Sequence, residues 1–388
     1  MIDHASAIAE LDAMARAARL RRIHVLAWRD LADVEAGGSE LHAAAIAALW
    51  AEAGIDVTIR TSYAQGHPPD ARRDGYRVIR RAGRYLVFPR AVVAELAGRH
   101  GPRDALVEIW NGMPFWSPLW CRGPRVVFCH HVHGPMWSMV LPPNLARIGE
   151  TVERRVAPPV YHGSTIVTLS ESSRRELIDQ LHFHPARVRV VPPGIDRRFT
   201  PGRKKSPHPL VVAVGRLMPV KRFDALIDTM ARVRERVADA QLVIVGEGAE
   251  HDHLVSRIEE HDAKEWVTLA GRIGDDELVS LYRRAWLVAS ASAAEGWGMT
   301  ITEAAACGTP AVVTDIAGHR DAVRNGVSGL LVPVERLDDA IAELLSDEAQ
   351  RKRLADGARV RAHALTWEAT ALGTLEAIAV DAHRHHAD

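Results

Sequence analysis

Two glutamates eight residues apart stand among glycines in residues 295–303, whose sequence is EGWGMTITE. The segment lies between an apolar run that predicts a strand ending near Ser290 and a stretch that predicts a helix beginning near Thr300. Glycines let the backbone approach a ligand, and the free amides and positive end of a helix favour a phosphate. A capping box of Thr300 with Glu303 is the structural alternative, but it explains neither Glu295 nor the two glycines. We therefore predict a binding site for a phosphate-bearing ligand here.

Cations that suit a diphosphate follow another predicted strand, Leu210–Val214. Gly215 and Arg216 come directly after this strand, and Lys221 lies five residues beyond Arg216. A diphosphate carries about two negative charges, so a site that stabilises it as a leaving group needs cations where that charge develops. Surface lysines and arginines are usually only solvated, but their position at the carboxyl end of a strand favours a ligand. We predict that Arg216 and Lys221 bind a diphosphate.

A Gly-Gly turn in the first half of the chain is a weaker feature of the same kind. Gly37 and Gly38 follow the predicted strand Ile23–Ala27 and precede a predicted helix that runs through Trp50. Such turns bind phosphates at helix starts, but they are common and carry little weight alone.

Three histidines, His130, His131 and His133, follow the predicted strand Val126–Cys129. Their spacing does not match the ligand spacing of zinc sites, and neither a cysteine pair nor a Glu-x-x-His motif accompanies them, so we predict no metal. A histidine at a strand end suits a hydrogen bond to a substrate near the reacting carbon, and we predict this for His130. Loop histidines without a chemical function are the alternative, above all for His131 and His133.

The elements that position these residues alternate between short β-branched runs and longer helical patterns, as expected of parallel sheets covered by helices. The fold class is therefore α/β, with two doubly wound, Rossmann-like domains facing each other across a cleft, where their ligands bind beyond the carboxyl ends of the strands. Pro192-Pro193-Gly194 and the polar stretch 203–209 predict the linker. The predicted domains are residues 1–195, residues 196–366, and a final helix over 367–388. The predicted strands are 23–27, 57–61, 105–109, 126–129, 165–169 and 188–191, then 210–214, 241–245, 267–269, 287–290, 311–314 and 329–332.

Composition excludes several classes of protein. Among 388 residues, 49 Lys and Arg balance 49 Asp and Glu, so no global field attracts nucleic acid. There is no apolar run long enough to span a membrane and no signal-like apolar segment at the start, so we expect a cytoplasmic protein. Cys121, Cys129 and Cys307 are too few and too scattered for a disulfide framework or a zinc site.

Taken in order, the motifs resemble those of the retaining glycosyltransferases of family 4, which have the GT-B fold. The resemblance covers nearly the whole chain, from Arg22 to Trp367. Two positions depart from the family pattern: Pro193 stands where many relatives have Asn, and Arg222 where many have Gly or Asn. The motifs that carry the resemblance are Gly37 to Glu40, His130, Pro192 to Asp196, Gly215 to Lys221, Gly246 to Gly248, and Glu295 with Glu303.

This resemblance implies transfer of a hexose, with retention, from a GDP- or UDP-linked donor to a hydroxyl of a glycan, lipid or small-molecule acceptor. It implies no metal and no cofactor besides the donor, in keeping with the lack of an Asp-x-Asp-like pair at a strand end. The leaving phosphate is expected to take the acceptor's proton, so no protein base is needed, and the final helix is expected to return to the acceptor-side N-terminal domain. The implied roles are catalysis for His130 and Glu295 beside the donor sugar, ribose binding for Glu303, diphosphate binding for Arg216, Lys221, Gly38 and the amides of Gly298, Met299 and Thr300, and contact with the base for Ile273.

Other functions stay open on the same scaffold: a sugar-nucleotide epimerase or phosphorylase, or a non-catalytic carbohydrate-binding relative. The acceptor is not identified by any motif. The segment Arg72–Arg90 holds seven arginines against one aspartate, with aromatic residues between them. It predicts either a solvated basic face or a peripheral contact with an anionic acceptor or with headgroups at the inner face of a membrane.

Overall fold

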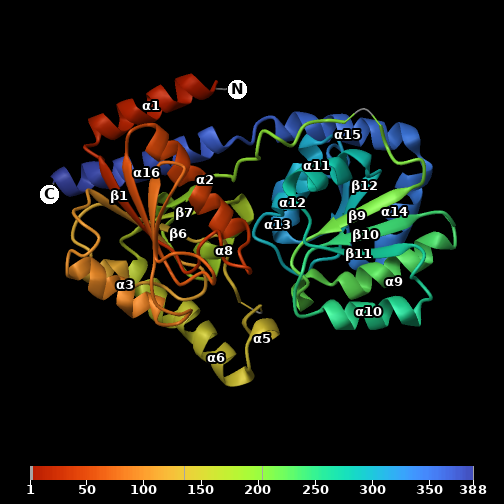
Figure 1. Ribbon diagram of the computed structural model, residues 1–388, viewed down its shortest axis with the longest axis horizontal. Coiled ribbons are helices and arrows are strands. Elements are labelled where there is room, and N and C mark those ends of the chain that lie inside the picture. Colours follow the sequence, from red (N-terminus) through yellow and green to blue (C-terminus); the bar gives the residue numbers. More distant parts are fainter. Residues whose placement is uncertain (1–2, 135, 203, 388) are drawn as a thin grey trace. The chain divides into compact units, whose positions relative to one another are not determined.

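The computed structural model describes residues 3–134, 136–202 and 204–387, and it divides into two compact units (Figure 1). Unit 1 runs to Gly194 and resumes at Thr366, and unit 2 is Ile195–Leu365. The predicted domain boundaries, after residues 195 and 366, each lie one residue beyond these points. Among the described residues, no helix is both long and apolar enough to cross a bilayer.

Unit 1 is built on an eight-stranded sheet with the order β3-β4-β2-β1-β5-β6-β7-β8. All neighbouring strands are parallel except β3, which pairs antiparallel with β4. Strand β5 is buried along its whole length, as expected of a central parallel strand covered on both faces. The strands are β1 Arg22–Leu26, β2 Asp56–Thr61, β3 Asp70–Arg73, β4 Tyr76–Arg80, β5 Ala105–Ile109, β6 Arg125–Phe128, β7 Thr165–Thr168 and β8 Val188–Val190.

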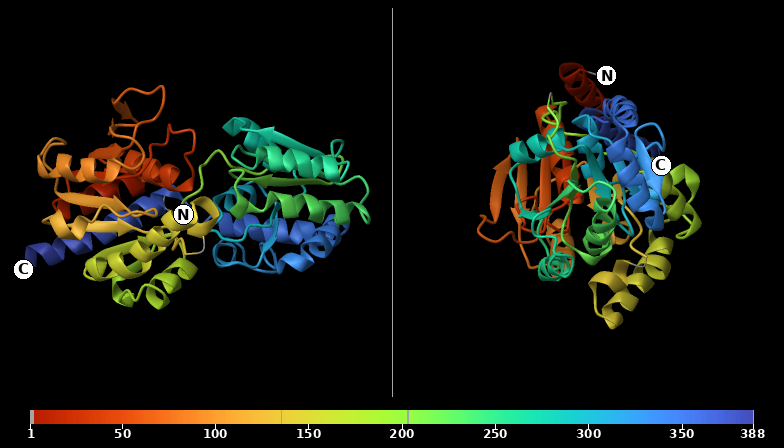
Figure 2. Two further views of the ribbon diagram at one scale, coloured as in Figure 1. Left: turned by 90° about the horizontal axis from the view of Figure 1, so that it is seen from below. Right: turned by 90° about the vertical axis from the view of Figure 1, so that its right-hand side faces the viewer.

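The helices of unit 1 include the last helix of the chain, which lies beside the first (Figure 1; Figure 2, right). Apolar residues of α1, α2 and α16 share one core, in which Leu11, Trp50 and Leu375 are fully buried. The indole of Trp50 donates to the carbonyl of Ala371 at 3.1 Å, which fixes α16 against α2. The helices are α1 His4–Ala17, α2 Gly38–Glu52, α3 Val87–Leu96, α4 Ser117–Trp120, α5 Met136–Val140, α6 Pro143–Thr151, α7 Ala157–Tyr161, α8 Glu171–Asp179 and α16 Trp367–Ala387, with a π turn at Val152–Val156 and a 3-10 turn at Pro185–Arg187.

Unit 2 is built on a six-stranded parallel sheet with the order β11-β10-β9-β12-β13-β14. The first strand of the unit, β9, therefore lies between β10 and β12, and the chain changes direction across the sheet at this point. Doubly wound sheets bind ligands at the carboxyl ends of the two strands beside such a switch. The strands are β9 Leu210–Val214, β10 Gln241–Val245, β11 Val267–Gly271, β12 Leu287–Ser290, β13 Ala311–Thr314 and β14 Gly329–Val332. The helices are α9 Phe223–Arg234, α10 His251–Glu260, α11 Asp275–Arg284, α12 Met299–Ala306, α13 Ala317–Ala322, α14 Leu337–Ser346 and α15 Glu348–Ala362, with 3-10 turns at Pro219–Lys221 and Val334–Arg336.

One part of the predicted linker was wrong. Within the stretch 203–209, which we expected to join the domains, Lys205 is packed into unit 2 and donates to the carbonyl of Ala285 at 2.7 Å and to the hydroxyl of Thr309 at 2.8 Å. Burial lowers the pKa of Lys205 to about 8. The polar stretch that predicted a linker thus includes a lysine whose ammonium group donates to carbonyl and hydroxyl groups of unit 2.

Candidate active site

The predicted diphosphate-binding lysine meets the first predicted glutamate at the carboxyl ends of β9 and β12. The turn Pro219–Lys221 returns toward β9, so that the side chain of Lys221 packs against Gly215. The ammonium group of Lys221 is paired with Glu295 Oε1, which also accepts from the hydroxyl of Ser292 at 3.0 Å. Arg216 lies in the same loop and is exposed. Lys221, Ser292 and Glu295 line one small pocket together with Thr300.

The electrostatics of Glu295 follow from these neighbours. Burial alone would raise the pKa of Glu295, but Lys221 and His319 outweigh burial, and the pKa lies below its usual range. The carboxylate is therefore ionised, and its charge is compensated by the same lysine that we predict to bind a diphosphate.

A histidine that sequence reasoning missed supports this glutamate. His319 in α13 is fully buried, and its Nδ1 lies 2.8 Å from the carbonyl of Thr314, so Nδ1 carries the proton and donates. The hydroxyl of Thr314 in turn donates to the carbonyl of Ser292 at 2.7 Å. Gly318 packs against the backbone of Glu295, where a Cβ atom would stand 2.2 Å from the Glu295 carbonyl oxygen. The segment Thr314–His319 thus packs against the loop that carries Glu295 and is hydrogen-bonded to it through Ser292.

The second glutamate, Glu303, lies in the second turn of α12. Gly298 precedes this helix in the left-handed conformation, with φ of 92°, and no side chain caps the helix. The amides of Met299 and Thr300 belong to the first turn, where no intrahelical carbonyl is available. Glu303 accepts from the hydroxyl of Tyr282 at 3.3 Å. Burial raises the pKa of Glu303 to about 7, and the Tyr282 hydrogen bond opposes this shift.

The Gly246–Gly248 motif after β10 shapes the loop that carries Arg216. A Cβ atom on Gly246, whose φ is 141°, would stand 1.9 Å from the carbonyl oxygen of Gly215. A Cβ atom on Gly248 would stand 2.2 Å from the carbonyl oxygen of Leu217. Only glycine allows this approach of the two loops. Ile273, the residue predicted beside the base, follows β11 at the same edge of the sheet and is partly buried.

In unit 1, the predicted Gly-Gly turn begins α2. Gly37 precedes the helix and Gly38 is its first residue, and the carboxylate of Glu40 accepts from the Gly37 amide at 2.8 Å. Glu40 therefore stabilises the helix start, and Arg29 lies 3.6 Å from its other oxygen.

His130, the other predicted catalytic residue, lies two residues beyond β6 and is buried, with 5% of its surface exposed. Its Nε2 atom is 3.0 Å from Nδ1 of His42, a residue of α2 that sequence reasoning missed. Burial, followed by the neighbouring histidines, lowers the pKa of His130 well below its usual range. That the carboxyl edges of the two sheets face each other across a cleft stays a prediction.

The remaining histidines of the cluster have structural contacts. Glu153 accepts from the amides of His133 and Gly134 and from the indole of Trp137, at 2.8 to 3.0 Å. The rings of His131 and His133 contact each other. This loop is therefore held by one buried carboxylate.

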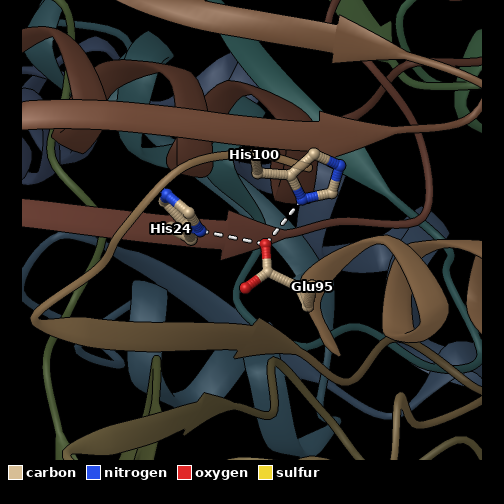
Figure 3. A group of neighbouring side chains, drawn as sticks. All are labelled: His24, Glu95 and His100. Atoms are coloured by element: carbon tan, nitrogen blue, oxygen red, sulfur yellow. Dashed lines mark hydrogen bonds and ion pairs between the residues drawn. The ribbon is translucent and has the colours of Figure 1, made fainter. Parts of the chain in front are cut away.

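Within the described parts of the chain, one group of side chains has ligand atoms close enough together to hold a metal. It lies apart from the predicted histidine cluster and consists of His24, Glu95 and His100 (Figure 3). Both imidazoles donate from Nδ1 to the same Glu95 oxygen, at 2.9 Å and 2.6 Å, and Arg103 donates to the other oxygen at 2.6 Å. Ligand atoms around tetrahedral zinc lie about 3.3 Å apart, given bonds of about 2.0 Å. These shorter separations and the adjacent guanidinium indicate a hydrogen-bonded ionic cluster. It fixes α3 to β1.

Five of the seven arginines in the basic segment Arg72–Arg90 pair with three acidic side chains of unit 1. Arg73 and Arg80 pair with the buried Asp30, Arg77 and Arg81 pair with Asp70, and Arg84 pairs with Glu35. These arginines therefore offer fewer free charges to an anionic surface than the sequence suggests. This observation weighs against the alternative in which the arginines themselves contact an anionic acceptor or headgroups.

Comparison with known proteins places the chain among sugar transferases. A family model described as "Glycosyltransferase Family 4" matches residues 36–199, and one described as "Glycosyl transferases group 1" matches residues 195–361. A D-inositol 3-phosphate glycosyltransferase of Segniliparus rotundus is 28% identical over 398 residues, which is 92% of this chain and 88% of the relative. A GDP-mannose-dependent alpha-(1-6)-phosphatidylinositol monomannoside mannosyltransferase of Mycobacterium tuberculosis is 30% identical over 306 residues, which is 71% of this chain and 76% of the relative.

Two solved structures illustrate the similarity of fold. Sucrose-phosphate synthase from Thermosynechococcus elongatus matches with a TM-score of 0.78 and 21% identity, covering 91% of this chain and 97% of that protein. Anabaena HepE in complex with UDP-glucose matches with a TM-score of 0.72 and 19% identity, covering 92% of this chain and 98% of that protein.

Proposed function

This chain belongs to glycosyltransferase family 4 and has the GT-B fold, and within that family we propose that it is a metal-independent, retaining hexosyltransferase. As a member it uses a nucleotide sugar. We propose a GDP- or UDP-linked hexose as the donor, and a hydroxyl of a glycan, lipid or small molecule as the acceptor. The observation that carries the proposal is the pairing of Lys221 with Glu295 beside the uncapped start of α12.

The donor would replace contacts that residues of unit 2 make with one another, above all the pair of Lys221 with Glu295. A diphosphate at the start of α12 would attract Lys221 away from Glu295, with Arg216 as the second cation. Glu295 would then be free to accept hydrogen bonds from hydroxyls of the donor sugar. Glu303 would accept from the ribose hydroxyls once it is ionised. Because the charge of the leaving diphosphate is balanced by these cations and by amides at the helix start, the proposal needs no metal.

The proposal of retention rests on the properties of His130, the residue that could have served as a general base for inversion. An inverting enzyme needs a general base opposite the leaving group, and a useful base has a pKa near the working pH. Burial lowers the pKa of His130 well below that range, which argues for a hydrogen-bonding role beside the sugar. The acceptor's proton would pass to the leaving phosphate on the same face of the sugar.

The test is a transfer reaction with the whole chain in excess chelator, after UDP-, GDP- and ADP-sugars have been screened for binding. The acceptor panel begins with inositol 3-phosphate and a phosphatidylinositol mannoside, which the names of the two relatives suggest. An α-linked product from an α-linked donor is expected, seen in the coupling of the new anomeric proton. A β-linked product would refute retention, and activity that returns only with added manganese or magnesium would refute metal independence.

Reactions without and with an acceptor separate two of the other functions. An epimerase would change the sugar of the nucleotide sugar without any acceptor, and a carbohydrate-binding relative would bind the donor without turnover.

The two glutamates provide a control within the donor site. Glu303→Ala is expected to weaken binding of the bare nucleotide diphosphate, whereas Glu295→Ala is expected to spare that binding and to reduce transfer. Titration calorimetry with GDP and UDP measures the first effect, and initial rates measure the second. Equal loss of nucleotide affinity in both variants would contradict the assignment of the two carboxylates.

We also propose that unit 1 contacts an anionic membrane surface, but through α3 rather than through the paired arginines. Leu86, Val93 and Leu96 are each more than half exposed and recur along one side of this helix. Arg90 lies on the same side. Glu95, the one acidic residue of α3, is bonded inward to the histidine cluster, so the exposed side carries no negative charge. An apolar stripe with a basic residue is the pattern of an interfacial helix.

Vesicle sedimentation tests this contact. The protein is expected to sediment with vesicles of anionic phospholipid and much less with phosphatidylcholine alone. The double substitution of Val93 and Leu96 by Ser is expected to weaken binding, whereas Val360→Ser, at a still more exposed apolar residue of unit 2, is expected to leave it unchanged. Equal sedimentation of the double variant and the Val360 control would refute the contact.

A further inference from the structure

Two buried histidines meet in unit 1, the predicted acceptor-side domain. His42 lies in the second turn of α2 with 1% of its surface exposed, and its Nδ1 atom is 3.0 Å from Nε2 of His130. The aromatic rings of Phe128 and Trp367 lie 5.2 Å and 5.9 Å from the His42 ring. Within the described ranges, His42 Nε2 and His130 Nδ1 have no hydrogen-bond partner. Among the described residues, His130 is therefore the one polar partner of the His42 ring.

Each ring of the pair carries a single proton near neutral pH. Burial lowers the pKa of His42 to about 4, and burial also lowers the pKa of His130, so both imidazoles are neutral. A neutral imidazole has one N–H donor and one acceptor nitrogen. The contact between the rings needs one donor and one acceptor, so the position of the proton on one ring determines the tautomer of the other.

The two possible arrangements differ in which polar group stays without a partner. If His42 donates from Nδ1, its own Nε2 is a bare acceptor, and the His130 proton lies on Nδ1. If His130 donates from Nε2, the proton of His42 lies on Nε2, in a buried place without a partner. A substrate oxygen can satisfy His130 Nδ1 in either case, but it leaves His42 Nε2 unpaired. Buried N–H groups without a partner are rarer than unpaired acceptors, so the first arrangement is favoured once a substrate oxygen pairs with His130 Nδ1.

We propose that His42 is a positioning residue that donates to His130 Nε2 and thereby fixes the proton of His130 on Nδ1. His130 then presents an N–H group to an oxygen of the substrate and has no free lone pair with which to accept the acceptor's proton. The proposal rests on the proposed function, since it assigns His130 a donor's role in a transfer with retention. The contact of Trp367 with the His42 ring gives the first turn of α16 a part in holding the pair.

The substitutions His42→Asn and His42→Phe separate this role from simple packing. The amide nitrogen of His42→Asn occupies nearly the position of the imidazole Nδ1 and can still donate to His130, whereas His42→Phe fills the space without a donor. We expect His42→Phe to lower kcat about tenfold, the effect of one lost hydrogen bond, with GDP and UDP affinity unchanged. His42→Asn is expected to keep most of the wild-type kcat.

The tautomer is measured directly by ¹⁵N NMR of the imidazole rings in the whole chain, with the nucleotide sugar that binds and without an acceptor, so that no turnover is needed. The expected result is a protonated Nδ1 of His130 in the wild type and in His42→Asn, and a loss of this tautomer in His42→Phe. A protonated Nε2 of His130 in the wild type would overturn the proposal, as would equal kcat for the two variants. If the tautomer is as expected but the product is inverted, the proposed retention fails and the assignment of the pair stands.

Discussion

The carboxyl group of Glu303 is the place where stability and ligand binding are expected to oppose each other. Burial raises its pKa from 4.5 to about 7, so ionising it inside the folded protein is unfavourable. The proposed contact with ribose needs the ionised form. The substitution Glu303→Gln keeps the shape and an oxygen that accepts from Tyr282, but it removes the charge. We therefore expect this variant to be more stable than the wild type and to bind nucleotide more weakly.

The size of the effect follows from linkage between proton binding and folding. The folded state binds the proton more tightly than the unfolded state, so the destabilisation is absent well below pH 4.5, grows between pH 4.5 and 7, and is complete above pH 7. A shift from 4.5 to about 7 corresponds to about 3 kcal/mol at pH 8 and about 1 kcal/mol at pH 5. Glu303→Gln is expected to recover most of this difference.

Urea unfolding of the wild type and of Glu303→Gln at pH 5 and pH 8 measures the difference in the free energy of unfolding. Glu265→Gln, at an exposed glutamate of the same unit, serves as the control and is expected to change stability by less than about 0.5 kcal/mol. A Glu303→Gln variant that is no more stable than the wild type at pH 8, or whose gain is the same at both pH values, would refute the reasoning. Calorimetry with GDP and UDP tests the expected loss of affinity.

Three further effects are expected. Gly246→Ala is expected to lower the free energy of unfolding by about 2 kcal/mol or more and to weaken binding of a diphosphate, because the new Cβ would displace the Gly215 carbonyl. Gly326→Ala, at a glycine with positive φ but open space around it, is the control, and calorimetry measures both variants. Burial opposes the lowering of the Glu95 pKa, but the histidine and arginine partners outweigh burial and bring the pKa to about 2. The wild type is therefore expected to lose about 3 kcal/mol of stability as the pH falls from 4.5 to 2. Acid unfolding of Glu95→Gln should not show this loss. Gly194→Ala is expected to lower the melting temperature by several degrees, because its Cβ would stand 2.2 Å from the Trp367 amide nitrogen; an unchanged melting temperature would contradict this.

The sequence was sufficient for those parts of the fold that depend on local pattern. Short β-branched runs predicted twelve strands, each of which has a counterpart in the structure, because parallel strands are buried on both faces and have continuous apolar sequences. The hairpin β3–β4 escaped notice because its arginines indicate a solvated surface. Its Arg80 is buried through a pair with Asp30, a partner fifty residues away that no local pattern indicates.

The candidate site was predictable to the same degree. Glu295, Lys221 and Glu303 stand in recognisable motifs beside glycines, and the structure brings Lys221 and Glu295 into contact. His42 and His319 were missed because a lone histidine in an apolar helical pattern carries no signal of its own. Their roles arise from contacts between elements, such as that of His42 with His130, which lies 88 positions further along the chain.

The chain leaves unit 1 and re-enters it at neighbouring points. Gly194 packs against the amide of Trp367, and the amide of Ile195 donates to the carbonyl of Leu365 at 3.1 Å. Unit 2 is thus inserted into unit 1, whose core includes Leu375 and Ile378 from the last helix. During synthesis, unit 2 can complete its fold while unit 1 still waits for α16 to leave the ribosome. A stop codon just after Leu365 would therefore release a chain with a whole unit 2 and an unfinished unit 1, whose uncovered Leu11 and Trp50 would make it a substrate for chaperones and proteases.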